Sequence, residues 1–69
     1  GDFARAADFG ERLRLRNPSN ARNLANLADI HRLSGNTKRA EMIAIEALSV
    51  DPDNILAAKI TERIRGEKI

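Results

Sequence analysis

The sequence contains no cysteine, tryptophan or tyrosine, and His31 is its single histidine. Without cysteine the chain forms no disulfide and no thiolate metal site, and one histidine is too few for a zinc site, which takes about four nitrogen or sulfur ligands. We therefore expect no metal and no cofactor. A chain of 69 residues has a small core, so it must gain stability from close helix packing, from association with copies of itself, or from a longer protein.

Aromatic residues and excess charge of one sign are also scarce. The chain has two phenylalanines, and 12 basic side chains against 10 acidic ones give a formal net charge of +2. Nucleic-acid-binding domains usually gather a larger basic excess on one face, and single-strand binders stack bases on aromatic rings. A nucleic-acid-binding helical domain is therefore a less favoured function.

Long apolar runs are missing from the sequence. No stretch is long enough for a membrane span, and none resembles the hydrophobic part of a signal peptide. We expect no membrane span here, and a cytoplasmic location is the default expectation. Because the chain begins with Gly1 rather than methionine, we expect it to be a fragment or a processed product of a longer protein.

Residue types that carry catalysis are few. Catalysis needs a nucleophile or an acid–base group held beside a partner that tunes it, and the glycines form no phosphate-binding motif. Asp51 and Asp53 stand at a predicted turn, where carboxylates cap helices. His31 is interpreted as a packing residue rather than a general base. We expect this chain not to be an enzyme.

Helix-forming residues fill four segments that are separated by turn signals. Pro18 disfavours helix at the residue before it, Gly35 permits the left-handed conformation that ends a helix, and Pro52 marks the third break. The expected N-caps are Ser19 or Asn20 for the second helix and Asp53 or Asn54 for the fourth. The predicted helices span residues 2–16, 20–34, 37–50 and 54–66.

Each predicted helix carries an apolar stripe at a spacing of three or four residues, which indicates one buried face. The stripes are formed by Phe3, Ala6, Phe9 and Leu13; by Leu24, Leu27, Ala28, Ile30 and Leu33; by Ala40, Ile43, Ala44, Ala47, Leu48 and Val50; and by Leu56, Ile60 and Ile64. Short loops make consecutive helices antiparallel. The sequence therefore predicts an all-α fold of about four helices.

Parts of the sequence recur at a spacing of 34 residues. "GDFARA" at 1–6 corresponds to "GNTKRA" at 35–40, and the same shift pairs Pro18 with Pro52 and Asn20 with Asn54. The matches lie at turns and at small residues, where helix geometry is most restrictive. A 34-residue period with two helices per unit is typical of the tetratricopeptide repeat (TPR).

The resemblance to the TPR family covers the whole chain. Residues 21–54 resemble one complete repeat, with Leu27-Ala28 where the family has Leu-Gly, Gly35-Asn36 at the inner turn and Asp51-Pro52 at the close. Residues 1–20 resemble the second half of a preceding repeat, and residues 55–69 a terminal or capping helix. The resemblance implies antiparallel helical hairpins stacked as an α-solenoid. A four-helix bundle with coincidental turn matches is the alternative.

The family resemblance also implies a function, namely a non-catalytic scaffold that binds a protein or peptide on its concave face. On this sequence the concave face comprises Arg22, Asn26, Asp29, Arg32, Lys59 and Arg63. Arginine binds carboxylates well, so we expect an acidic segment or a chain terminus as the ligand. Ala25 and Asp29 stand where chaperone-binding members carry Lys and Asn, so we do not expect chaperone C-termini as partners.

An alternative function is self-assembly through the first helix. In a TPR array this helix packs against a preceding helix, and no such helix precedes it in this sequence. Phe3, Phe9 and Leu13 are then expected to be partly uncovered. The chain would then either form a homo-oligomer through these three residues or pack them against a neighbouring segment upstream in a longer protein.

Overall fold

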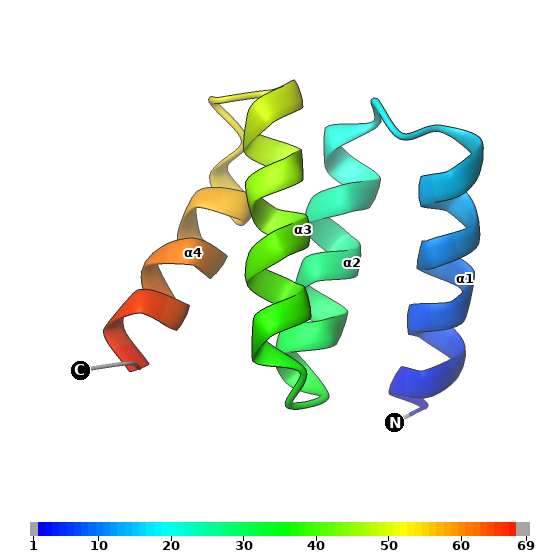
Figure 1. Ribbon diagram of the computed structural model, residues 1–69, viewed down its shortest axis with the longest axis horizontal. Coiled ribbons are helices and arrows are strands. Elements are labelled where there is room, and N and C mark those ends of the chain that lie inside the picture. Colours follow the sequence, from blue (N-terminus) through cyan, green and yellow to red (C-terminus); the bar gives the residue numbers. More distant parts are fainter. Residues whose placement is uncertain (1, 68–69) are drawn as a thin grey trace.

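The computed structural model describes residues 2–67, which form four α-helices and no strand (Figure 1). The helices are α1 (Phe3–Arg16), α2 (Ala21–Leu33), α3 (Thr37–Val50) and α4 (Ile55–Glu67). The all-α prediction is confirmed, and every predicted helix boundary lies within one residue of the observed one. Gly1 of the repeat and residues 68–69 of the predicted terminal helix lie outside the described residues.

Consecutive helices run antiparallel, and α2 is the helix on which the others assemble (Figure 1). It packs against α1, α3 and α4, and α4 also packs against α3. Within residues 2–67, α2 is the only helix whose backbone α1 approaches closely. None of the helices in this range combines the length and the hydropathy of a membrane span.

Asparagine side chains fix where α2 and α4 begin. The Oδ1 atom of Asn20 accepts a hydrogen bond from the Asn23 N–H at 3.0 Å, and Oδ1 of Asn54 accepts one from the Ala57 N–H at 2.9 Å. Each bond satisfies one of the free N–H groups of a helix start. Of the alternatives left open by the sequence, Asn20 and Asn54 are therefore the caps.

Gly35 ends α2 with a left-handed residue. Its φ is 89°, and the two N–H groups at the turn return to the helix: Asn36 donates to the carbonyl of His31 at 2.8 Å and Gly35 to that of Arg32 at 3.1 Å. This is the Schellman arrangement, in which glycine avoids the clash that a Cβ would cause. It sets the direction in which α3 leaves α2.

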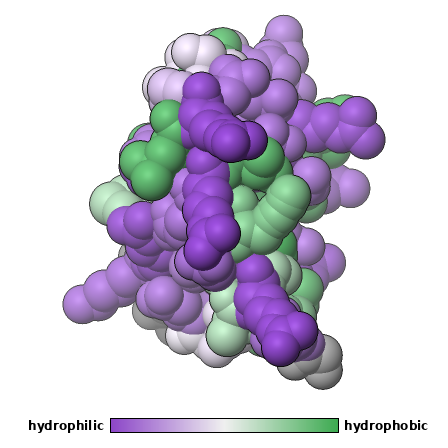
Figure 2. All heavy atoms as spheres, turned by 90° about the vertical axis from the view of Figure 1, so that its right-hand side faces the viewer, coloured by the Kyte–Doolittle hydropathy of each residue, from purple (hydrophilic) through white to green (hydrophobic). Residues whose placement is uncertain are grey.

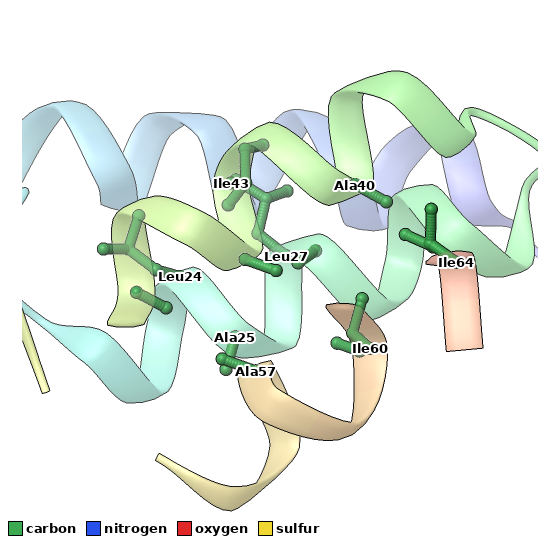
Figure 3. Close-up of a cluster of buried hydrophobic side chains, with 11 residues drawn as sticks. Leu24, Ala25, Leu27, Ala40, Ile43, Ala57, Ile60 and Ile64 are labelled. Carbon is green, nitrogen blue, oxygen red and sulfur yellow. The ribbon is translucent and has the colours of Figure 1, made fainter. Parts of the chain in front are cut away.

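The core lies between α2, α3 and α4, and its side chains point toward one another (Figure 3). It consists of Leu24, Ala25, Leu27 and Ala28 of α2, Ala40, Ile43, Ala44 and Ala47 of α3, and Ala57, Ile60 and Ile64 of α4. Alanines let helix axes approach closely while the branched side chains fill the space between them. By contrast, α1 contributes no buried residue.

Apolar residues at the ends of α2 and α3 are not buried. The sequence pattern places Leu33 and Val50 in apolar stripes, but they are 51% and 42% exposed. Each is the last residue of its helix, beside an exposed turn. At a helix end the spacing of a residue still matches the stripe, although no neighbouring helix covers it.

Gly10 allows α1 to approach the core. A Cβ atom at this position would lie 2.7 Å from Cδ1 of Leu27, and Leu27 is only 1% exposed. Any larger residue would push α1 away from α2 or displace a buried leucine. The glycine therefore sets how closely α1 packs.

Replacing Gly35 with alanine should lower the free energy of unfolding by about 1–2 kcal/mol, the cost of a left-handed residue with a Cβ. Urea denaturation followed by circular dichroism measures the loss. Gly66→Ala is the matched control, because Gly66 lies in α4 and a Cβ added there would meet no atom within 4 Å. That variant should be at least as stable as the parent. Equal stability of Gly35→Ala and the parent would contradict the role given to the turn.

Candidate functional site

A hollow of about 190 Å³ lies between α2 and α4. It is lined by Asp29, Arg32, Leu56, Lys59, Ile60 and Arg63. Four of the six residues predicted for the concave face therefore come together here. We call this hollow the α2–α4 groove.

Helix periodicity explains how the groove is built. Lys59 and Arg63 are four residues apart on α4, and so are Leu56 and Ile60, so the two pairs form adjacent rows along one side of the helix. Ile60 is 2% exposed and forms part of an apolar floor, while Lys59 and Arg63 are exposed. The groove thus has an apolar row and a cationic row side by side.

The remaining predicted residues do not line the groove. Arg22 and Asn26 are exposed on α2, but neither contributes to its wall. Ala25, the neighbour of Asn26 on α2, is 1% exposed and belongs to the core. The helix faces α4 at this position, and the small side chain allows the close contact.

The charges of the groove are not equally available. Nη2 of Arg32 lies 3.0 Å and its Nε 3.3 Å from Oδ1 of Asp29, so these two side chains neutralise each other. Lys59 and Arg63 make no ion pair with any side chain of residues 2–66. The two free cations therefore both belong to α4, and an oxyanion at this site would bind there.

The second predicted surface lies on α1. Phe3 is 39% and Phe9 54% exposed, while Leu13 is half-buried. A hollow of about 530 Å³ along this helix is lined by Asp8, Phe9, Arg12, Leu13, Leu15 and Arg16. Phe9 and Leu13 thus share one surface, and Phe3 lies outside it.

Sequence reasoning missed Leu15 on this surface. Leu15 is 78% exposed and lines the hollow between charged neighbours. Figure 2 faces α1 and shows a hydrophilic column with hydrophobic atoms on both sides of it. The alternating segment "RLRLR" was the available signal, because alternation on a helix places an apolar residue away from the core stripe.

Sequence reasoning also missed a polar cluster that ties α1 to α2 and α3. It comprises Glu11 and Arg14 of α1, His31 of α2, and Arg39 and Glu46 of α3. We call it the polar clasp. Nε and Nη2 of Arg39 donate to Oε2 of Glu11 at 3.0 and 2.8 Å, and Nε of Arg14 donates to Oε2 of Glu46 at 2.8 Å. These partners lie 28 and 32 residues apart in the chain, so no local pattern reveals them.

The polar clasp favours the ionised forms of its two carboxylates. Burial alone would raise the pKa of Glu11, but hydrogen bonds from Arg39 and His31 outweigh burial and hold that pKa below its ordinary value of 4.5. The hydrogen bond from Arg14 likewise lowers the pKa of Glu46, against the opposing effect of burial. Both glutamates therefore stabilise the fold when they are charged.

His31 has a structural position in this clasp. The residue is 8% exposed, its Nε2 lies 3.1 Å from Oε2 of Glu11, and its Nδ1 lies 3.5 Å from Nδ2 of Asn36. Both ring nitrogens thus face protein side chains, which supports the interpretation of His31 as a packing residue. Within the described residues no group of three or more His, Cys, Asp or Glu side chains is arranged to hold a metal ion.

The polar clasp should make the free energy of unfolding fall at acidic pH. Because the folded-state pKa values of Glu11 and Glu46 are lowered, their contribution is present above about pH 4.5 and is lost as pH falls through the folded values. Glu11→Gln should cost about 1–2 kcal/mol at pH 7, as expected for a partly buried charged hydrogen bond. Glu46→Gln should cost less, because solvent screens its side chain, which is 37% exposed.

Urea denaturation between pH 3 and pH 7 measures this dependence. The double variant Glu11→Gln, Glu46→Gln should show a flatter profile than the parent, with the two proteins converging at low pH. Glu62→Gln is the control, because Glu62 is exposed and lies outside the clasp. A double variant with the parent's pH profile would show that the clasp does not stabilise the fold.

No protein-family model, curated protein or solved structure matches this chain. A function must therefore be argued from the residues and their geometry. The two hollows that include predicted site residues are the α2–α4 groove and the hollow on α1.

Proposed function

We propose that this chain is a TPR-like, non-catalytic scaffold for protein–protein interaction, built as an α-solenoid. Its α2–α4 groove would bind an acidic segment of a partner protein. The observation that carries the proposal is the pair of free cations, Lys59 and Arg63, beside the apolar row of Leu56 and Ile60.

Recurring backbone hydrogen bonds support a repeated unit of 34 residues. The N–H of Asn17 donates to Leu13 at 2.8 Å, and the corresponding N–H of Asp51 donates to Ala47 at 2.9 Å. Three more N–H to carbonyl bonds recur with the same shift. The bond from Asn20 to Asn17 corresponds to that from Asn54 to Asp51, and the bond from Leu24 to Asn20 to that from Ala58 to Asn54. The bond from Ala6 to Asp2 corresponds to that from Ala40 to Asn36. These bonds lie at helix ends and turns, so they show that the helix boundaries recur with the 34-residue shift.

The chemistry of the groove favours an extended acidic ligand. Side chains on one side of an extended peptide are about 6.6 Å apart, close to the spacing of residues one helical turn apart. Two carboxylates at alternate positions would thus meet Lys59 and Arg63. A neighbouring apolar side chain would cover Leu56 and Ile60, which line the same hollow.

Charge reversal in the groove should abolish capture of an acidic peptide. We expect the double variant Lys59→Glu, Arg63→Glu to bind a fluorescent peptide with alternating acidic residues at least tenfold more weakly than the parent, as measured by fluorescence anisotropy. Arg65→Glu is the matched control, since Arg65 is an exposed arginine of α4 that does not line the groove. Equal weakening by the control would indicate a general charge effect, as would displacement of the peptide by nucleic acid, and either result would contradict the proposal.

Lengthening the chain by one repeat tests the solenoid arrangement separately. A chain with a second copy of residues 21–54 inserted after Asn54 should fold and unfold at a higher urea concentration than the parent, because each repeat of a solenoid adds an interface with its neighbour. A closed four-helix bundle would be disrupted by two extra helices. Loss of helical circular dichroism or lower stability in the longer chain would therefore reject the solenoid.

A further inference from the structure

The hollow on α1 has the residue spacing of a surface that pairs with another helix. Its lining residues occupy positions 8, 9, 12, 13, 15 and 16, so they fall on one side of the helix over two turns. Phe9 and Leu15 are 54% and 78% exposed. Large apolar side chains that are this exposed and that border one hollow indicate an interaction surface.

The corresponding surface of α3 shows how a second neighbouring helix would bury the apolar residues of α1. Shifted by 34 residues, Ala6, Phe9, Gly10 and Leu13 correspond to Ala40, Ile43, Ala44 and Ala47. All four residues of α3 are 0% exposed, because α3 has a helix on each side. The four residues of α1 are half-buried or exposed, since among the helices of residues 2–67 only α2 packs against α1. One further helix would complete the burial.

We propose that this helix is α1 of a second copy of the chain, packed antiparallel about a two-fold axis near Arg12. In that arrangement residues at equal distances from position 12 lie opposite each other. Asp8 of one copy then faces Arg16 of the other, and Phe9 faces Leu15. Each contact occurs twice, because a two-fold interface uses the same surface on both copies.

The charges of α1 favour this occupant. Nη2 of Arg12 lies 3.3 Å from Oδ2 of Asp8 in the same helix, which reduces the repulsion between the two Arg12 side chains at the axis. Arg16 has no ion pair with the side chains of residues 2–66. It is therefore available to the carboxylate of Asp8 in the second copy, which would lie between two guanidinium groups.

The opposite end of the molecule argues against head-to-tail growth. The residues of α4 that correspond to the buried Ala28 and His31 of α2 are Glu62 and Arg65, and both are exposed. Stacking α1 of another copy on this face would bury charged side chains where α2 places an alanine and a shielded histidine. Association through α1 alone closes at two copies, whereas head-to-tail contacts would extend without limit.

Charge exchange between Asp8 and Arg16 tests the arrangement. We expect the 69-residue chain to sediment as a dimer at high concentration, and Asp8→Arg and Arg16→Asp each to weaken dimerisation at least tenfold. An equimolar mixture of the two variants should recover dimers, because both ion pairs form again in the heterodimer. Analytical ultracentrifugation measures all four samples, and circular dichroism checks that each variant keeps its helices.

A second pair of variants tests the apolar contact. Leu15→Ser should also weaken dimerisation, whereas Ile55→Ser should not, although Ile55 is 71% exposed and equally apolar. A monomeric parent at millimolar concentration would overturn the proposal. So would a mixture of the charge variants that stays monomeric, or oligomers that grow with concentration beyond two copies. None of these results depends on the α2–α4 groove.

Discussion

The close contact between α2 and α3 is the constraint on which the rest of the structure depends. Ala28, Ala40, Ala44 and Ala47 are completely buried, and side chains this small let the two helix backbones approach. Gly35 fixes the turn between them. Once this hairpin is set, α1 and α4 pack on opposite sides of it (Figure 1), and the groove and the α1 hollow lie on different parts of the surface.

The two outer helices are attached in different ways. Ala57, Ile60 and Ile64 bury α4 in the core, so the hydrophobic effect holds it in place. In contrast, α1 has no buried residue and depends on the approach at Gly10 and on the polar clasp. Charged hydrogen bonds require specific geometry, and they fix the rotation of α1 about its axis. That rotation keeps Phe9 and Leu15 on the outside.

The sequence predicted the helices well because its local signals agree with one another. Asparagine caps, Gly35 and the two Asp/Asn-Pro breaks are short-range features, and the three breaks between the helices followed from them. The α2–α4 groove was also anticipated in part, because four of its residues follow from helix periodicity and the 34-residue shift. Periodicity alone could not separate the buried Ala25 from the exposed Asn26, since both lie near the edge of the same face.

The sequence pattern did not reveal which charged side chains pair with one another in the folded chain. Glu11 and Asp29 look alike as charges on a helix, yet one holds α1 through Arg39 and the other neutralises Arg32 within its own helix. Only the structure shows which charged side chains already form ion pairs within the fold.

Whether a charged side chain is paired or unpaired indicates a functional residue better than its charge alone does. Many surface charges lack a partner and are simply solvated, so an unpaired cation alone indicates nothing. Lys59, Arg63 and Arg16 differ from these because each also borders a hollow with apolar walls. A ligand that binds there gains burial of apolar area and a new ion pair together, and the apolar contact lowers the solvent screening that makes exposed ion pairs weak. The two surfaces follow from this single criterion, although they lie on different helices and would bind different partners.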